Sequence, residues 1–100
     1  MYGLFLAHIN SLSVERITLW FNAKSAPYVL SKPLHGSQRK LSHDQNGLLI
    51  EIEVIPNFEL ETLILSYGER VKVLSPEDFK DRISARISKM ADNYKIDLTT

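Results

Sequence analysis

The dipeptide Asn46-Gly47 is the strongest constraint on the fold of this chain. Both positions tolerate a positive φ, as the two-residue turn of a β-hairpin requires. Residues 48–55 then alternate apolar side chains with Glu51 and Glu53, which predicts a strand with one buried face, ended by Pro56. Residues 38–43 are expected to form the partner strand, although their strand propensity is weak. The inward side chains of the better strand are expected to be Leu48, Ile50, Ile52 and Val54.

The segment before the hairpin contains one further strand and one short helix. Residues 14–21 alternate in the same way, which predicts a half-buried strand. Asn22 is expected to cap a helix that runs through residues 28–30. Pro33 stops this helix, because proline disfavours the helical conformation of the residue before it. The inward side chains of the strand are expected to be Ile17, Leu19 and Phe21.

Two longer helices and a short strand are expected after the hairpin. Asn57 is the predicted N-cap of the first helix, and Gly68 is placed to end it in the left-handed conformation. Residues 71–74 are expected to form the strand, and Ser75 to cap the last helix with Pro76 at its first position. Apolar residues recur at helical spacing in both helices. They are Leu60, Leu63, Ile64 and Tyr67 in the first, and Phe79, Ile83, Ile87, Met90 and Tyr94 in the second.

The expected order is therefore β-α-β-β-α-β followed by an extra C-terminal helix. This order predicts an α+β, ferredoxin-like sandwich, in which two helices cover one face of a four-stranded antiparallel sheet. In that arrangement the first and third strands are central neighbours. The side chains expected on the open face are Arg16, Thr18, Trp20, Glu51, Glu53 and Lys72.

The composition limits the possible functions. One hundred residues suit a single domain, and 12 basic residues balance 12 acidic ones. A dedicated nucleic-acid binder usually has a basic excess, so any contact with nucleic acid should be local or assisted by another domain. The absence of cysteine excludes disulfides and thiolate metal sites. No apolar run is long enough to span a bilayer, residues 2–7 lack the basic start of a signal peptide, and a cytoplasmic location is expected.

The loop between the short helix and the second strand carries the first candidate site. Three hydrogen-bonding side chains lie there in a local positive field, so the loop is a candidate contact for an anionic ligand or a neighbouring domain. In the alternative interpretation, Ser37 or Gln38 satisfies nearby backbone groups. The candidate contact residues are Lys32, His35, Ser37, Gln38, Arg39 and Lys40.

Arg16 and Trp20 form a second candidate site, an interface on the open face of the sheet. Tryptophan and arginine are favoured at the centres of interfaces. The alternative is a Trp20 ring that lies flat over neighbouring charged side chains. On the last helix, Arg82, Arg86 and Lys89 are expected to form an ordinary solvated face, with Asp78 and Arg82 as an i, i+4 pair.

No pattern for catalysis or metal binding is evident. His8, His35 and His43 have neither i, i+4 spacing nor a cluster of carboxylates, so no metal site is expected. Ser37 near His35 lacks an elbow turn and a placed acid, so no catalytic residue is assigned. The glycines form no phosphate-binding loop, and no cofactor is expected.

Taken in order, the motifs of residues 14–94 resemble the WCX domain, the C-terminal extension of WYL-type bacterial transcriptional regulators. Gly36 stands where that family often has proline, and Leu34 where it often has an aromatic residue. Residues 2–5 are similar to the segment that leaves a preceding WYL domain. The resemblance thus implies a tail or connector over residues 1–12, a domain over 13–94 and a frayed end over 95–100. The motifs are Ala26-Pro27-Tyr28-Val29, His35-Gly36-Ser37-Gln38, Asn46-Gly47, residues 59–68 and residues 71–78.

The resemblance implies that the chain is not an enzyme but a module for dimerisation and effector coupling. It would orient a ligand-sensing WYL domain and an upstream winged helix that binds DNA. The expected partners are a second copy, a WYL domain of the same or the partner protomer, and an anionic effector such as single-stranded nucleic acid. No membrane contact is expected.

The same fold also carries other functions. A small-ligand sensor of the ACT type stays open, because such sites form at dimer interfaces with little local signature. A single-stranded nucleic-acid module would use aromatic side chains on the central strands, but Glu51 and Glu53 lie beside Trp20 on that face. An acylphosphatase-like enzyme would need an arginine-bearing anion loop near the first strand, and the sequence has none.

Overall fold

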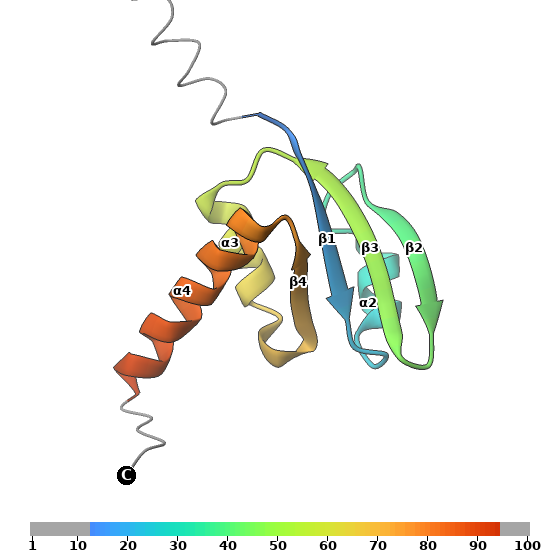
Figure 1. Ribbon diagram of the computed structural model, residues 1–100. Coiled ribbons are helices and arrows are strands. Elements are labelled where there is room, and N and C mark those ends of the chain that lie inside the picture. The colour runs from blue at the N-terminus through green and yellow to red at the C-terminus, as the bar shows by residue number, and fades with distance from the viewer. Residues whose placement is uncertain (1–12, 95–100) are drawn as a thin grey trace, which may run out of the picture.

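The computed structural model describes residues 13–94. Within them the chain follows the predicted order β-α-β-β-α-β, with an extra helix at the end (Figure 1). The interpretations of residues 1–12 and 95–100 lie outside the described residues. The elements are β1 (Glu15–Phe21), α2 (Ala26–Ser31), β2 (Arg39–Asp44), β3 (Gly47–Val54), α3 (Phe58–Leu65), the 3₁₀ turn η1 (Gly68–Arg70), β4 (Val71–Ser75) and α4 (Glu77–Asn93).

The four strands form one antiparallel sheet in the order β2-β3-β1-β4. This order confirms the ferredoxin-like α+β fold, with β1 and β3 as the central neighbours. In the register of the sheet, Trp20 lies between Leu49 on β3 and Lys72 on β4, and Thr18 lies opposite Glu51. These residues therefore share the open face, as the alternation predicted.

The β2–β3 hairpin forms where it was predicted, but its two loop residues are Gln45 and Asn46, one position before the expected pair, and Gly47 begins β3 opposite Asp44. Gly47 has a φ of 133°, a conformation that residues with a side chain rarely adopt. The amide of Asn46 donates to Asp44 Oδ1 at 2.8 Å. A Cβ atom at position 47 would lie 2.4 Å from Trp20 Nε1, so the tryptophan ring and the turn leave space only for glycine.

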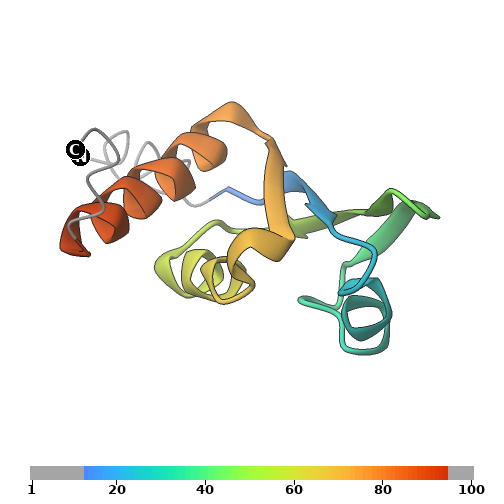
Figure 2. The same cartoon turned by 90° about the horizontal axis from the view of Figure 1, so that it is seen from below.

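Helices α2 and α3 cover one face of the sheet and enclose the core (Figure 2). Every inward residue predicted for β1 and β3 is buried. α4 lies beyond the β4 edge of the sheet, outside the layer of α2 and α3 (Figures 1 and 2). The largest fully buried side chains are Phe21, Phe79, Ile17, Leu19, Leu48, Ile50, Ile52, Ile64 and Val29.

The helix ends agree with the sequence in part. Asn57 caps α3, since its Oδ1 accepts the Leu60 amide at 2.8 Å, and Gly68 has the predicted left-handed φ of 59°. The prediction that Ser75 caps α4 is wrong, because Ser75 ends β4 opposite Thr18 and Pro76 takes the cap position without a side-chain bond. The prediction that Asn22 caps α2 is also wrong, because Ser25 takes the cap position, and Asn22 Oδ1 accepts the Ser25 amide at 2.9 Å in the turn before the helix.

The apolar stripe of α4 is only half covered. Phe79 and Ile83 are buried in the core, whereas Ile87, Met90 and Tyr94 are 51%, 47% and 76% exposed. The apolar spacing that the sequence shows along the whole helix therefore does not correspond to burial in its second half, because α4 extends past the sheet (Figure 1). Among residues 13–94, no helix is both long enough and apolar enough to cross a membrane.

Candidate functional site

Gln38 braces the loop between α2 and β2. Its side-chain Oε1 accepts the Leu34 amide at 2.9 Å, and its Nε2 donates to the Val29 carbonyl at 3.1 Å. The Gln38 amide in turn donates to the His35 carbonyl at 3.0 Å. One side chain thus joins the last turn of α2 to the loop, which is the backbone-satisfying role of the alternative interpretation.

Ser37 fastens the same loop to β3. Its Oγ accepts the Glu53 amide at 2.8 Å and lies 3.2 Å from the Glu53 carbonyl, to which it can donate. Arg39 of β2 lies opposite Glu51 of β3. In the same antiparallel register, Ser37, two residues earlier, lies opposite Glu53, two residues later. Its hydroxyl therefore continues the β2–β3 pairing by one step through a side chain.

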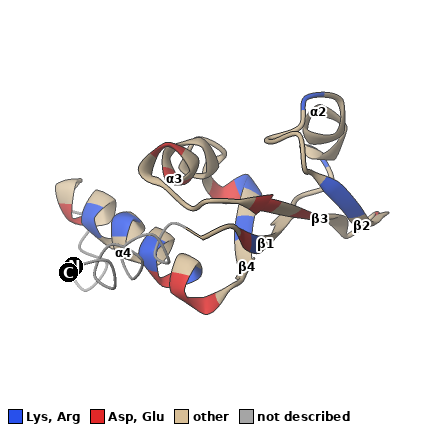
Figure 3. Ribbon diagram, turned by 90° about the horizontal axis from the view of Figure 1, so that it is seen from above, with Lys and Arg blue, Asp and Glu red and all other residues tan. Residues whose placement is uncertain are grey.

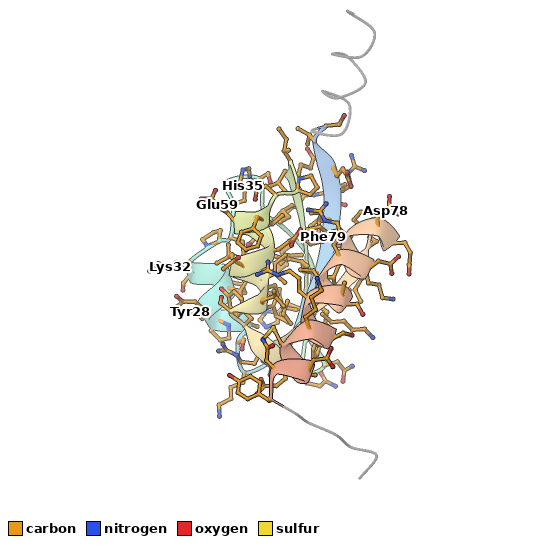
Figure 4. The ribbon with its side chains drawn as sticks, turned by 90° about the vertical axis from the view of Figure 1, so that its left-hand side faces the viewer. Tyr28, Lys32, His35, Glu59, Asp78 and Phe79 are labelled. Atoms are coloured by element: carbon orange, nitrogen blue, oxygen red, sulfur yellow. The ribbon has the colours of Figure 1, made fainter. Side chains whose placement is uncertain are left out.

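His35 lies on the loop, and one of its two ring nitrogens, Nδ1, takes part in hydrogen bonds with Ser37. The Ser37 amide donates to His35 Nδ1 at 3.0 Å, and the Ser37 hydroxyl lies 2.8 Å from the same atom. An Nδ1 atom that accepts a hydrogen bond carries no proton, so the neutral ring bears its proton on Nε2. His35 lines a hollow of about 550 Å³ together with Glu59 of α3, and Figure 4 shows the two residues at the same end of the molecule.

The three basic residues of the loop region do not converge. The Arg39 side chain lies on the open face of the sheet, where it pairs with Glu51. Lys32 and Lys40 are exposed and form no ion pair with any residue between 13 and 94. The structure thus separates Arg39 from His35, and a contact role for the loop stays a prediction.

The open face of the sheet carries a cluster of alternating charges on its central strands. Arg16 of β1 lies 3.7 Å from Glu51 and 3.4 Å from Glu53, and Arg39 of β2 also pairs with Glu51. Figure 3 shows the acidic positions of β3 between basic positions on β1 and β2. The two guanidinium groups leave Glu51 only 9% exposed. The hydrogen bond and the charge of Glu51 raise the pKa of Arg39 above its ordinary value.

Trp20 lies on the same face and is fixed to the hairpin turn. Its Nε1 donates to the Asn46 carbonyl at 3.1 Å, and its ring lies against Gly47. The residue is half-buried. The proposed interface role of Arg16 and Trp20 stays a prediction.

A second charged cluster, which the sequence did not reveal, joins α3 to α4. Glu61 is buried and accepts Arg82 Nε at 2.9 Å and Arg86 Nη1 at 3.2 Å. The two guanidinium groups also lie over aromatic rings, Arg82 over Phe79 at 5.5 Å and Arg86 over Phe58 at 4.3 Å. The predicted solvated face with an Asp78–Arg82 pair is therefore wrong for both arginines, because Glu61 binds them.

Metal binding finds no support in the part of the chain that the structure describes. No group of three or more His, Asp or Glu residues between positions 13 and 94 could hold an ion. His43 belongs to exposed β2, and His8 lies outside the described residues.

Comparison with known proteins gives one family. Residues 13–91 match the model of the WCX domain, which covers every described element except the last residues of α4. A comparison with curated proteins gives no significant match.

Proposed function

The chain belongs to the WCX domain family, and on that premise we propose that it is a non-catalytic module for dimerisation and effector coupling. WCX domains are associated with WYL-type regulators. In this proposal the chain acts in the cytoplasm of a bacterium as part of a transcriptional regulator. It orients a ligand-sensing WYL domain and a DNA-binding winged helix located upstream, while DNA contacts belong to the winged helix.

The observation that carries the proposal is the uncovered face of the sheet. α2 and α3 lie on the other face (Figure 3). Arg16, Glu51 and half-buried Trp20 lie on the central strands β1 and β3 of the open face. A two-fold interface brings the same patch of both copies together. A patch with both signs of charge on adjacent strands can pair with itself in this way, because a guanidinium of one copy can face a carboxylate of the other.

Light scattering tests the dimer directly. We expect the 100-residue chain to show a mass that rises from monomer to dimer between micromolar and millimolar concentrations. Arg16→Glu should remove this rise, because it places a third carboxylate beside Glu51 and Glu53. Lys80→Glu on α4, which leaves the open face unchanged, is the matched control. A monomeric mass at every concentration would contradict the dimer.

Fluorescence anisotropy tests the absence of direct duplex binding. A balanced charge and two carboxylates on the open face support weak or no affinity for duplex DNA. Any binding of an oligonucleotide should be to single strands and should weaken as salt is added. Tight binding of duplex DNA by the chain alone would contradict the proposed division of labour.

A further inference from the structure

A hollow of about 550 Å³ lies where the loop before β2, the end of β3 and helix α3 meet. Leu34 and His35 line it from the loop, Val54 lines it from β3, and Leu60 and Leu63 line it from α3. A concavity of this volume with mainly aliphatic walls and a few polar groups is typical of a binding site for a small molecule.

Each wall of the hollow is held in place by hydrogen bonds inside the protein. Gln38 Oε1 accepts the Leu34 amide at 2.9 Å and so fixes the loop. Ser37 Oγ accepts the Glu53 amide at 2.8 Å, which ties the same loop to the end of β3. Asn57 caps the first turn of α3. Because the walls are fixed in advance, little protein has to become ordered when a ligand enters.

Part of the aliphatic wall is accessible. Leu63 and Ile55 both line the hollow, and they are 38% and 43% exposed. Exposed apolar surface gains free energy when hydrocarbon covers it and removes it from water. The hollow therefore suits a ligand with an aliphatic part.

The charge of the hollow is negative. Its charged lining residues are Glu53 and Glu59, and no lysine or arginine between positions 13 and 94 lines it. The Glu53 carboxylate lies 3.4 Å from Arg16, whereas Glu59 forms no ion pair in the described part of the chain. Neutral His35 offers an N–H group at Nε2, which is a donor without a net charge. The Glu59 charge is therefore not compensated, and it favours a cationic ligand.

We propose that this hollow is a binding site for a small aliphatic amine. The ammonium group pairs with the Glu59 carboxylate, and the alkyl chain covers Leu60 and Leu63. Figure 4 shows Glu59 and His35 at the same end of the molecule. This site goes beyond the proposed function, which assigns ligand sensing to a WYL domain. Its ligand has the opposite charge to the one expected for the His35 loop, because the Arg39 side chain lies on the open face of the sheet.

Nuclear magnetic resonance titration of the 100-residue chain with hexylammonium chloride tests the site. We expect the amide signals of Leu34, Glu59 and Leu63 to shift with a Kd of the order of millimolar, since so small a ligand makes few contacts. Hexanol has the same chain length without the charge and should bind about fivefold more weakly. Hexanoate should bind more weakly than hexanol, because its charge repels Glu59. Sodium chloride at equal concentration is the blank for ionic strength.

Glu59→Gln tests the charged contact. It should weaken the binding of hexylammonium by about fivefold, to the affinity of hexanol, because the ion pair is lost. Hexanol should bind as it does to the wild type, which shows that the hollow is intact. Glu69→Gln is the matched control, since Glu69 is also exposed but lies in η1, outside the lining of this hollow.

Leu63→Ser tests the aliphatic wall. It should weaken hexylammonium and hexanol by the same factor, about fivefold, because both ligands lose the same apolar contact. Leu74→Ser is the matched control, since Leu74 is equally exposed at 38% but lies on β4. Circular dichroism spectra equal to that of the wild type show that both variants are folded.

Three results would overturn the proposal. They are binding of hexanoate at least as tight as that of hexylammonium, an equal loss in Glu59→Gln and Glu69→Gln, and signal shifts centred on Arg16 and Glu51 of the open face. Tighter binding of a short lysine peptide than of hexylammonium, at the same signals, would assign the hollow to a protein segment and refute a free amine. The dimer is measured separately by light scattering, so the two proposals can fail independently.

Discussion

At the scale of single residues, the position that tolerates change least is Gly47. A Cβ atom there would lie 2.4 Å from Trp20 Nε1 and 2.5 Å from the Phe21 carbonyl, at a φ of 133°. Gly47→Ala should lower the free energy of unfolding by about 2–4 kcal/mol through strain and overlap. Gly68→Ala is the control, because Gly68 also has a positive φ but open space around it, and should cost about 1 kcal/mol. Equal losses in urea unfolding would contradict the close packing of Trp20.

Gln38 gives a second prediction at this scale. Gln38→Ala removes the bonds to the Leu34 amide and the Val29 carbonyl and should lower the free energy of unfolding by about 2 kcal/mol. Lys40→Ala, an exposed change two residues away, should alter it by less than about 0.5 kcal/mol. If both variants unfold at the same urea concentration, Gln38 does not brace the loop.

The sequence predicted residues with local roles better than residues with distant partners. Asn57 and Gly68 were identified because a helix cap and a left-handed turn depend on the nearest few residues. The sequence did not reveal that Trp20 is bonded to the hairpin turn, because its hydrogen bond to the Asn46 carbonyl joins residues 26 positions apart. The sequence also could not show that the Arg39 side chain lies away from the loop. That position depends on the pairing of β2 with β3, which places Arg39 opposite Glu51.

At the scale of elements, the α3–α4 contact depends on Glu61. Glu61→Gln removes the charge that binds Arg82 and Arg86, and thermal unfolding should show a loss of about 1–3 kcal/mol. This loss of stability is smaller than that expected for a fully buried ion pair, because the Arg82 side chain is 47% exposed and water screens its charge. Glu59→Gln is the matched control: it lies in the same first turn and sees the same helix dipole, but has no arginine partner among residues 13–94. A loss as large in Glu59→Gln would contradict this assignment.

The elements themselves were predictable because their periodicity and turn residues are local. The alternation around Glu51 and Glu53 sufficed to place β3 to within one residue at each end, although the turn before it lies one position earlier than predicted. The spacing of Leu60 and Ile64 sufficed to place α3. The direction of α4 was not predictable. Its apolar stripe has the same spacing throughout, yet only Phe79 and Ile83 reach the core, since α4 lies beyond the β4 edge and runs away from the sheet (Figure 1).

At the scale of the whole molecule, Tyr67 links stability to alkaline pH. Its ring packs edge-on against Phe21 at 5.0 Å and beside Tyr28 at 6.5 Å, with Arg70 at 5.4 Å from its centre. It thus touches β1, α2 and η1 from the end of α3, and exposing it requires these elements to separate. Burial, followed by the proximity of Tyr28, raises the pKa of the Tyr67 phenol above its ordinary value, while Arg70 lowers it by less.

The sign of the pH dependence follows from that direction. Between the pKa of an unfolded tyrosine, about 10, and the higher pKa in the fold, the folded state holds a proton that the unfolded state has lost. The contribution of Tyr67 to stability is therefore fully present below about pH 10 and is lost as the pH rises through the pKa of the folded state.

Tyr67→Phe keeps the ring and removes the proton, so the difference in unfolding free energy between the wild type and Tyr67→Phe should change in this range only. Tyr28→Phe, which removes the neighbouring phenol, should reduce the alkaline slope only in part, because burial contributes more than Tyr28 to the raised pKa of Tyr67. Urea unfolding on both sides of pH 10, with the ultraviolet absorbance of tyrosinate recorded in parallel, measures the slope, and a wild-type slope equal to that of Tyr67→Phe would show that the phenol titrates as in the unfolded chain.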